Sequence, residues 1–353
     1  MDKKNLERLR AKYGGAGGSD VMDPQFKKVV DLLFTGGSRK KPYSGVPTLL
    51  GAPYHPDAAD KADFGGLDIA LIGVPMDLGV TNRPGARFGP RAIRAMERIG
   101  PYNHALKVVP NAEAKVADVG DVPFRSRFSL DQSIEDIETY YTRVAAAGVR
   151  PCSAGGDHSI TYPIMKALGR ERPLGMVHID AHSDTSGEYD GAKFHHGGPF
   201  RWAVLDGVLD PQRTIQVGIR GSAEFLWEFA YDSGMTLIHA EKFAEMGVEA
   251  VIAKALEVVG DGPVYISLDV DGIDPAYAPG TGTPEVGGLS PREVQAWLRG
   301  LKGLDIVGGD VVEVAPQYDT TTNTAQLGGQ MLFEILSLMV LSPGLKSQRG
   351  QER

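Results

Sequence analysis

The sequence of 353 residues contains a single cysteine, Cys152. A lone cysteine excludes an intrachain disulfide and a cysteine-based zinc site, and it is typical of a reducing compartment. No apolar run approaches the ~20 residues that cross a bilayer, and the opening MDKKNLERLR lacks the apolar core of a signal peptide. We therefore expect a cytoplasmic protein that makes no contact with a membrane.

The sequence also lacks an excess of basic residues. Lysine and arginine number 37 against 45 acids, the formal net charge is -8, and no long basic block is present. Nucleic acid is therefore not an expected partner. With 42% hydrophobic residues the chain can bury a large core, but its length does not separate one large α/β domain from two smaller ones.

Regular patterning begins near residue 67, after a segment rich in proline and glycine. Short β-rich runs then alternate with helical patterns, which predicts an α/β fold with a mostly parallel sheet covered on both faces. We expect an irregular N-terminal extension over 1–65, one domain over 66–345 and a solvated tail over 346–353. The predicted strands lie at 67–75, 149–156, 174–181, 213–221, 236–240, 263–270 and 304–315, and the predicted helices at 90–99, 129–148, 159–170 and 290–303.

Charged side chains follow the predicted strand GMVHI at alternate positions. Asp180, His182 and Asp184 lie where this strand runs out into a loop. The period of two places all three on one side of an extended chain. The carboxyl ends of parallel strands line the crevice in which sites form, so this loop is predicted to deliver three ligands to one point.

Three more predicted strands end in the same way, with His158 in SAGGDHSI, Asp269 and Asp271 in SLDVDGID, and Glu313 in VVEVAP. Oxygen and nitrogen ligands without sulfur suit manganese, iron, cobalt or nickel better than a structural zinc. So many acids at one sheet edge are unfavourable without cations, and they favour two bridged metals over one. His178, inside the apolar strand, is expected to be a hydrogen-bonded core histidine.

These segments together resemble the ureohydrolase family, which includes arginase, agmatinase, guanidinobutyrase, guanidinopropionase and formimidoylglutamase. The motifs that carry the resemblance are GGDHS, DAHSDT, SLDVDGIDPAYAPGTGTPEVGGLS and EVAP, and it extends over about residues 67–341. It implies a three-layer α/β/α fold around an eight-stranded, mostly parallel sheet. It also implies a binuclear metal site, with manganese as the first expectation and nickel as the alternative.

The resemblance also implies the ligand sets of the two metals. Two of the six ligands, Asp180 and Asp269, would bridge the ions. The first metal would be held by His158, Asp180, Asp184 and Asp269, and the second by Asp180, His182, Asp269 and Asp271.

The reaction that the resemblance implies is hydrolysis of a guanidino compound to urea and an amine by a hydroxide that bridges the metals. The family places a proton-transferring histidine in an HG(x)PF segment, and FHHGGPF offers His195 and His196. Only one of two neighbours can face the metals on an extended chain, and we predict His196. Glu313 matches the carboxylate that anchors the guanidinium, and Asp184 completes the predicted catalytic set.

Two loops leave the substrate contacts open. The segment GVTNRPGARFGPRAIR resembles the agmatinase-like branch more than arginase, and it is either a packed loop or a substrate contact through Asn82 or Arg83. PGTGTPEVGG is expected to be a rigid loop beside the metals, with a substrate contact through Glu285 as the alternative.

Loop 185–195 should line the entrance to the site, and its charges point in two directions. Glu188 and Asp190 favour a second cationic end, as in agmatine, whereas Lys193 favours a carboxylate, as in guanidinobutyrate or guanidinopropionate. A pocket narrowed by aromatic rings would instead suit a small or alkylated guanidine, and the resemblance extends to relatives that act on guanidine itself or on biguanides of the metformin type. The aromatic residues concerned are Tyr189, Phe194 and Trp202. We predict a substrate other than arginine.

Two other classes of protein remain as alternatives. A non-catalytic subunit of a mixed complex would keep the fold but lose ligands, and a deacetylase of related fold would use fewer aspartates around one zinc. This sequence keeps all six candidate ligands. The expected partners are a small guanidino substrate and further copies of the chain in a trimer or hexamer, with a hetero-oligomer containing a paralogue as the alternative.

Overall fold

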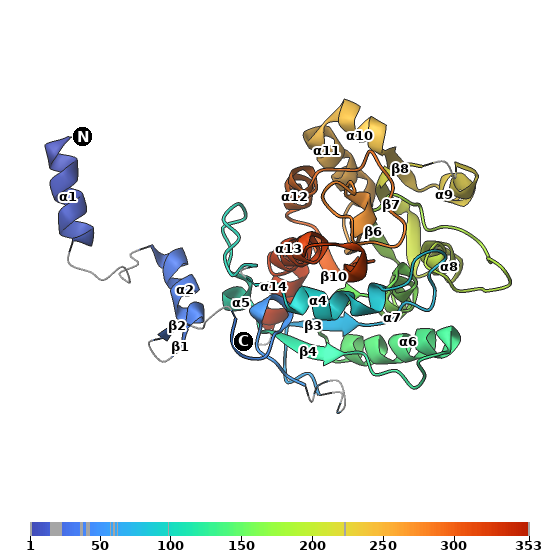
Figure 1. The fold of residues 1–353 in the computed structure, drawn as a ribbon, viewed down its shortest axis with the longest axis horizontal. Helices are drawn as coiled ribbons and strands as arrows, with labels where there is room; N and C mark the ends of the chain where they lie inside the picture. Colours follow the sequence, from blue (N-terminus) through green and yellow to red (C-terminus); the bar gives the residue numbers. More distant parts are fainter. Residues whose placement is uncertain are drawn as a thin grey trace.

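The computed structural model describes residues 2–14, 23–35, 38–39, 43–56, 58, 61, 63–97, 99–221 and 224–351. Most of these residues form a three-layer α/β/α body, and the first two helices lie to one side of it (Figure 1). Within the described ranges, no helix is both long and apolar enough to cross a bilayer.

The central sheet has eight strands in the order β4-β3-β5-β10-β9-β6-β7-β8. Every pairing within it is parallel, which confirms the predicted fold class and makes the sheet wholly parallel instead of mostly so. The strands are β3 (Ile69–Val74), β4 (Val116–Asp121), β5 (Arg150–Gly155), β6 (Leu174–Ile179), β7 (Leu209–Ile219), β8 (Thr236–His239), β9 (Pro263–Asp269) and β10 (Asp305–Val312).

The edge strand β4 was not among the predicted strands, because Asp118 and Gly120 interrupt its short apolar pattern. Asp118 is nevertheless fully buried, and its carboxylate accepts hydrogen bonds from the guanidinium of Arg94 at 2.8 and 3.0 Å. The backbone N–H of Leu49 donates a further bond at 2.7 Å. A buried acid with such partners is compatible with a strand.

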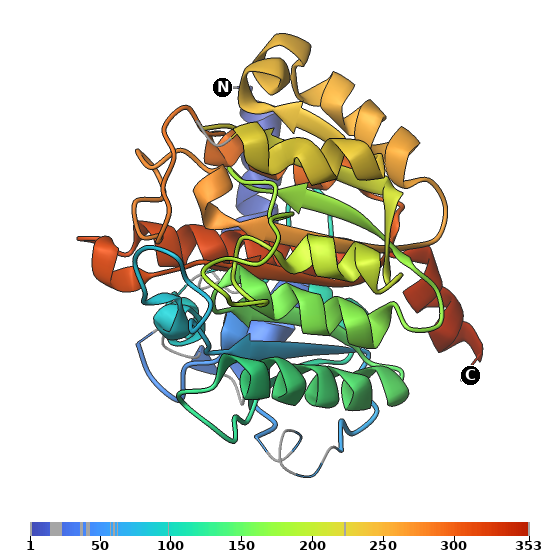
Figure 2. The same cartoon turned by 90° about the vertical axis from the view of Figure 1, so that its right-hand side faces the viewer.

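Helices cover both faces of the sheet (Figure 2). The side chains of β3 alternate between two hydrophobic clusters, with Leu71 packed in one and Ile72 in the other. The first cluster includes side chains of α4 (Gly89–Arg94), α10 (Ala240–Met246), α11 (Val248–Val259), α12 (Pro291–Gly300) and α13 (Asn323–Met339). The second includes side chains of α6 (Leu130–Ala146), α7 (Thr161–Leu168), α8 (Pro199–Leu205) and α9 (Glu228–Ser233).

The predicted helices occur as α4, α6, α7 and α12, and local capping explains where two of them begin. The hydroxyl of Ser129 accepts a hydrogen bond from the backbone N–H of Gln132 at the start of α6. At α12, Ser290 and Glu293 form a capping box next to Pro291, the first helical residue.

Regular elements also occur in the two terminal segments that were expected to be irregular or solvated. These are α1 (Lys3–Tyr13), α2 (Pro24–Leu33), the short pair β1 (Phe34–Thr35) and β2 (Ser38–Arg39), and α14 (Pro343–Gln351). In α2, Phe26 contacts the ring of Tyr102 edge-on at 5.8 Å, whereas α1 buries no residue. Residues 15–22 of the expected extension and 352–353 of the expected tail lie outside the described residues. The boundaries at 66 and 345 remain predictions.

Candidate metal centre and active site

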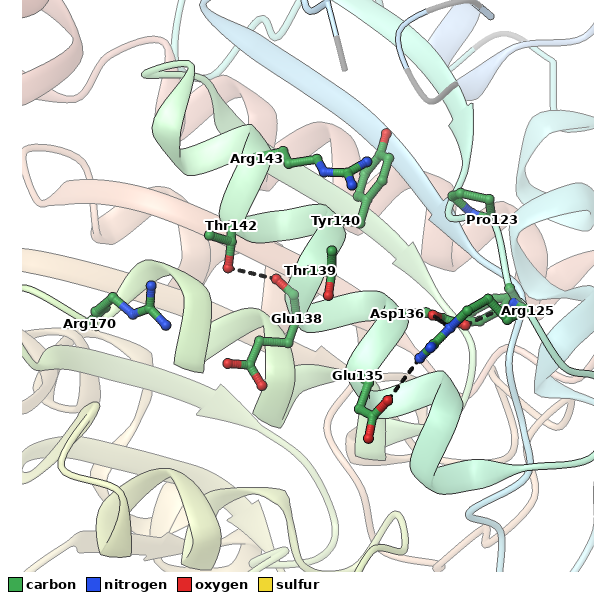
Figure 3. Close-up of a pocket in the computed structure, with 11 residues that line it drawn as sticks. Pro123, Arg125, Glu135, Asp136, Glu138, Thr139, Tyr140, Thr142, Arg143 and Arg170 are labelled. Carbon is green, nitrogen blue, oxygen red and sulfur yellow. Dashed lines mark hydrogen bonds and ion pairs between the residues drawn. The ribbon is translucent and has the colours of Figure 1, made fainter. Parts of the chain in front are cut away.

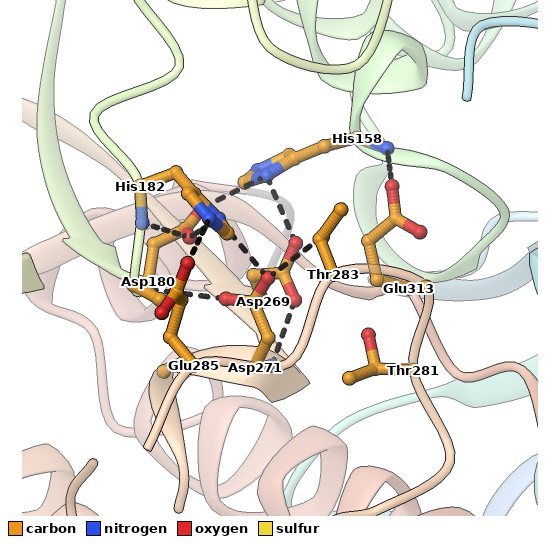
Figure 4. Close-up of polar contacts among 12 residues, drawn as sticks. His158, Asp180, His182, Asp269, Asp271, Thr281, Thr283, Glu285 and Glu313 are labelled. Carbon is orange, nitrogen blue, oxygen red and sulfur yellow. Dashed lines mark hydrogen bonds and ion pairs between the residues drawn. The ribbon is translucent and has the colours of Figure 1, made fainter. Parts of the chain in front are cut away.

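The candidate residues converge at the carboxyl ends of β5, β10, β9 and β6, four strands that are neighbours in the sheet (Figure 4). Short connections place them there. His158 lies in a single turn directly after β5, and Asp269 is the last residue of β9. Parallel pairing therefore brings together residues that are up to 155 positions apart, as between His158 and Glu313.

A sharp turn after β5 presents His158 to the site. Gly156 has a φ of 49°, and a Cβ there would meet the carbonyl oxygen of Val74 at 2.4 Å, so the turn requires glycine. Asp157 then caps the following turn by accepting a hydrogen bond from the backbone N–H of Ser159 at 2.9 Å. The turn is thus fixed from both sides of His158.

Two candidate site residues adopt a left-handed backbone that non-glycine residues seldom take. The φ angle is 51° at Asp184 and 63° at Glu313. Such conformations cost about 1–3 kcal/mol each and persist where the surroundings hold them. The backbone N–H of Glu313 donates to the carbonyl of Gly156 at 2.9 Å, and the N–H of Phe200 donates to the carbonyl of Asp184 at 3.1 Å.

The first cluster surrounds the Nδ1 atom of His158. Nε2 of His158 lies 2.8 Å from the hydroxyl of Ser267, which donates its own hydrogen to the buried Asp310 at 2.7 Å. Ser267 must therefore accept from Nε2–H, which leaves the lone pair of a neutral His158 on Nδ1. Three carboxylate oxygens, those of Asp184, Asp180 and Asp269, lie at 2.9, 3.2 and 3.4 Å from this Nδ1.

The second cluster surrounds His182, which is half-buried. Its Nδ1 lies 3.1 Å from Oδ2 of Asp271 and 3.5 Å from Oδ1 of Asp180. Asp180 therefore lies between the two histidines with one carboxylate oxygen toward each. Oδ2 of Asp269 faces His158 while its Oδ1 accepts the backbone N–H of Asp271 at 2.8 Å.

Without a cation, protons balance the charge of these carboxylates. Burial and the negative charges of Asp271 and Asp180 raise the pKa of Asp269 well above its usual range, and burial raises the pKa of Asp271 to about 6. Burial acts to lower the pKa of His158 and of His182, but the carboxylates outweigh it and raise both well above the usual value. Carboxylate and imidazole ligands that bind protons in this way also suit divalent cations, which displace the protons when they bind.

His178 contacts the first cluster without offering a free ligand atom. The amide nitrogen of Gln216 donates to Nδ1 of His178 at 3.0 Å, so Nε2–H of His178 donates to Asp180 at 2.8 Å. Although its position beside His158 and Asp180 would suit a ligand, both ring nitrogens are engaged. This confirms a hydrogen-bonded core histidine, and it adds that His178 orients Asp180.

The neighbours His195 and His196 point to different surroundings. Nδ1 of His196 lies 2.9 Å from Oε1 of Glu313, and its Nε2 lies 2.7 Å from the hydroxyl of Thr81. Nε2 of His195 instead lies 2.6 Å from the carbonyl of Gly187 in the entrance loop. Burial acts to lower the pKa of His196, but the charge of Glu313 outweighs it and raises that pKa to about 9.

Glu313 keeps one carboxylate oxygen without a partner. Its Oε1 accepts hydrogen bonds from the backbone N–H of His158 at 2.9 Å and from His196. Its Oε2 is buried and has no hydrogen-bond partner in the described part of the chain. The site therefore contains a buried, charged acceptor that is available to an added donor.

The two loops whose role the sequence left open are bound to each other. The side chain of Asn82 donates to the carbonyl of Gly282 at 3.1 Å, and the guanidinium of Arg83 donates to the carbonyls of Gly282 and Thr281 at 3.1 and 3.0 Å. These contacts give both side chains a packing role. Glu285 remains partly exposed, with Oε1 at 4.0 Å from Nε2 of His182.

Charged residues of the entrance loop lie at the surface. Glu188, Tyr189, Asp190 and Lys193 are all exposed. The ammonium of Lys193 lies 4.5 Å from the ring of Trp202 and 5.0 Å from that of Phe194. Both rings therefore lie within cation–π distance of the Lys193 ammonium.

Sequence reasoning missed the residues that support the ligands. Ser267 and Asp310 fix the ring of His158, and Thr81 contacts the ring of His196. Ser267 lies two positions before Asp269, and Asp310 lies inside an apolar strand. Alternation along each strand could therefore have indicated both residues. Thr81 carried no such signal, because its contact depends on a loop 115 residues away from His196.

Comparison with known proteins agrees with this geometry. Residues 67–337 match the model of the arginase family. The chain belongs to this family. The match confirms the expected membership of the ureohydrolases and, with it, the expectation of an enzyme.

Several proteins similar to this chain are named for guanidino compounds other than arginine. A guanidinopropionase of Pseudomonas aeruginosa is 49% identical over 304 residues, 85% of this chain and 93% of the relative. A mitochondrial agmatinase of Gallus gallus is 46% identical over 86% of this chain and 87% of its own length. Among solved structures, proclavaminate amidino hydrolase of Streptomyces clavuligerus superposes with a TM-score of 0.80 at 36% identity, covering 85% of this chain and 99% of that one.

Proposed function

We propose that this member of the arginase family hydrolyses a guanidino compound other than L-arginine to urea and an amine. The observation that carries the proposal is the buried Oε2 of Glu313, an acceptor without a partner in the described chain. A buried polar group left unpaired costs about 1–3 kcal/mol, and more when it is charged. A planar guanidinium supplies both the charge and the N–H donors that this oxygen lacks.

Two divalent cations complete the proposed site. When bound, they supply a water acidified for attack at neutral pH and offset the charge of the carboxylates. Carboxylate and imidazole donors without sulfur suit manganese, our first choice, with nickel as the alternative. The first cation would be held by His158, Asp180, Asp184 and Asp269, and the second by Asp180, His182, Asp269 and Asp271.

The chain's own groups orient the substrate and move the proton. Glu313 holds the guanidinium through Oε2 and, through Oε1, keeps the ring of His196 beside it. His196 gives a proton to the departing amine, which cannot leave as an anion. Asp184, which contacts Nδ1 of His158 at 2.9 Å, keeps negative charge near His196 and so favours its protonated form.

The proposed substrate class is agmatine, guanidinobutyrate or guanidinopropionate. The guanidinopropionase and the agmatinase named above support it, as do the exposed charges of the entrance loop, which can bind a second charged end of a substrate. The alternative, guanidine or an alkylated guanidine or biguanide, needs aromatic rings to narrow the pocket. Tyr189 is 56% exposed, and Trp202 and Phe194 lie within cation–π distance of Lys193, so we place this alternative second.

We further propose that the chain acts in the cytoplasm as a homo-oligomer, a trimer or hexamer. A non-catalytic role beside a paralogous subunit is the less favoured alternative. All six candidate ligands lie within the two clusters described above, and a subunit freed from catalysis would have no need to retain them.

A urea-release assay on six compounds tests the proposal, with the protein loaded with manganese and, separately, with nickel. The panel is L-arginine, agmatine, guanidinobutyrate, guanidinopropionate, guanidine and an alkylated guanidine. We expect kcat/KM for the best compound to exceed that for L-arginine by at least about tenfold, the value of one polar contact that the arginine head group would lose. L-arginine as the best substrate, or no urea from any compound, would overturn the proposal.

A single substitution tests the role of Glu313 as the guanidinium anchor separately from metal binding. Glu313→Gln removes the charge but keeps the size and one acceptor. Loss of a charge-assisted hydrogen bond costs about 1.5–3 kcal/mol, so kcat/KM should fall by about 10- to 150-fold. The metal content should be unchanged, and a loss of metal from this variant would contradict the assigned role.

A further inference from the structure

The ring of His196 is held on its second nitrogen by Thr81, a residue of the loop between β3 and α4. Nε2 lies 3.1 Å from the backbone N–H of Thr81 and 2.7 Å from its hydroxyl. A backbone N–H can only donate, so Nε2 accepts in the neutral ring. The proton of neutral His196 is then on Nδ1, directed at Glu313 2.9 Å away.

The hydroxyl of Thr81 fits both protonation states of this ring. It donates to Nε2 when His196 is neutral, and it accepts from Nε2–H when His196 is an imidazolium, because a hydroxyl can take either part. The backbone N–H of Thr81 can only donate, so it cannot accept a hydrogen bond from Nε2–H. The hydroxyl is therefore the group at Nε2 that can pass a proton in either direction.

Burial differs sharply between the two partners of this contact. The ring of His196 is buried and its Nδ1 faces the buried Glu313, whereas Thr81 is exposed. Among the described residues, the hydrogen bonds to Nε2 come from Thr81 alone. Thr81 thus lies between a buried proton carrier and solvent.

The position of Thr81 is fixed by the fold. The backbone N–H of Gly79 donates to the buried carboxylate of Asp157 at 2.7 Å, and its carbonyl accepts the backbone N–H of His196 at 2.8 Å. The loop is thereby attached both to the turn that carries His158 and to the segment that carries His196.

We propose that Thr81 is a positioning residue that relays protons between solvent and His196. The inference rests on the proposed function, in which His196 gives up one proton per turnover and must regain it. After Nε2 has given its proton to the amine, a buffer acid passes a proton to Oγ1 of Thr81 while the hydroxyl proton moves to Nε2. The conjugate base of the buffer remains in solution, so that only O–H and N–H bonds form and break. The charged groups that act on the His196 ring are Glu313, Asp184 and Asp157.

Three variants of the metal-loaded full chain test the relay in dilute, bulky buffer. Thr81→Val removes the hydroxyl at nearly constant size, Thr81→Ser keeps it, and Thr139→Val is the matched control. Thr139 is exposed on α6 and lines a groove that contains none of the candidate site residues (Figure 3). We expect kcat of Thr81→Val to fall by about tenfold or more, since proton transfer contributes ~100- to 10,000-fold, with KM and metal content unchanged.

Rescue of turnover by a small buffer is a measurement that would not change if Thr81 had only a structural role. Added imidazole should restore much of the turnover of Thr81→Val while leaving the unmodified protein, Thr81→Ser and Thr139→Val unaffected. The relay is overturned if Thr81→Val turns over normally, if Thr81→Ser is as slow as Thr81→Val, or if imidazole restores nothing. Absence of urea from the unmodified protein with every guanidino compound would instead overturn the proposed function, and the relay with it.

The contact itself can be tested without turnover. Diethyl pyrocarbonate acylates unprotonated imidazole nitrogens, and peptide mass spectrometry resolves His196 from His195. Thr81→Ala should be acylated at His196 several-fold faster than the unmodified protein, with His195 unchanged because Gly187 holds its Nε2. Equal rates at His196 in both proteins would show that Thr81 does not cover Nε2 and would overturn the inference.

Discussion

The candidate metal-ligand cluster and loop 185–195, the predicted entrance loop, adjoin in the sequence but are held in different ways. Asp180 and Asp184 are buried, and a few residues later Glu188 and Asp190 are exposed. Strand pairing and a layer of supporting side chains fix the first pair. The entrance loop is closed on itself by reciprocal backbone bonds between Tyr189 and Ala192 at 2.8 and 3.0 Å.

This difference separates the residues that are expected to carry out the reaction from those that are expected to determine the choice of substrate. The candidate ligands cannot move without disturbing the sheet, so the chemistry proposed for them would be common to every substrate that reaches them. The entrance loop can change its side chains without disturbing the core, because they are exposed. Substitutions in the cluster should therefore abolish turnover of every guanidino compound, whereas substitutions in the loop should change the ranking of substrates.

The largest effect is expected for Asp269→Ala. It removes a carboxylate that would bridge two cations and leaves the neighbouring buried charges uncompensated. Activity should be lost on all six compounds, and metal analysis should show fewer ions per chain than in the unmodified protein. Normal turnover by this variant would refute the two-metal site, and with it the contrast between the ligand cluster and the entrance loop.

The next largest effect is expected for His196→Ala. Loss of the proposed proton carrier should lower kcat by about 100- to 10,000-fold, with full metal content because neither cluster includes this ring. His195→Ala is the matched control, because it removes the adjacent ring, which contacts the entrance loop instead. If the control were inactive and His196→Ala active, the two assignments would be exchanged.

The protonation of the cluster predicts how metal stabilises the protein as pH changes. Without metal, the carboxyl of Asp271 has a pKa of about 6, against ~3.9 in an unfolded chain. The folded state thus binds more protons, and stability falls as pH rises through this window. His158 and His182, whose pKa values are also raised, contribute stability below pH ~6.5 that is lost as pH rises through their folded values.

Bound cations would replace these protons, so stabilisation of the protein by metal should increase as pH rises. Affinity should rise about tenfold per pH unit for each proton displaced. Differential scanning calorimetry should show a larger increase in Tm on adding manganese at pH 8 than at pH 6. Equal increases at both pH values would mean that the carboxylates and histidines do not hold protons in the metal-free protein.

The smallest effects are expected at the entrance. Lys193→Gln and Glu188→Gln each remove one exposed charge, which is worth about 0.2–1 kcal/mol. KM should change by no more than a few-fold, in opposite directions for agmatine and guanidinobutyrate, and the change should shrink as salt is added. A loss of kcat on every compound would show that this loop belongs to the reaction machinery.

The sequence predicted the parts of the site that depend on strand ends. Parallel strands share an edge, so alternating ligands after the strands were enough to place Asp180, His182, Asp269 and Asp271 together. Strand β4 was missed because the ion pair that buries Asp118 is made by Arg94, which lies in another element. Thr81 was missed for the same reason, since a contact between two loops leaves no pattern in either one.

The position of β10 in the sheet has a consequence for how the protein matures. His158 follows β5, and the other candidate ligands lie at or just after the ends of β6 and β9, which pair with each other. Strand β10, residues 305–312, lies between β5 and β9, so His158 meets its partners only after this late segment has paired with both. The candidate ligand set is therefore completed only after residues 305–312 have left the ribosome. Sites built from carboxylate and imidazole ligands generally bind nickel more tightly than manganese, so an ion bound here would reflect the cellular supply of metal as well as its affinity.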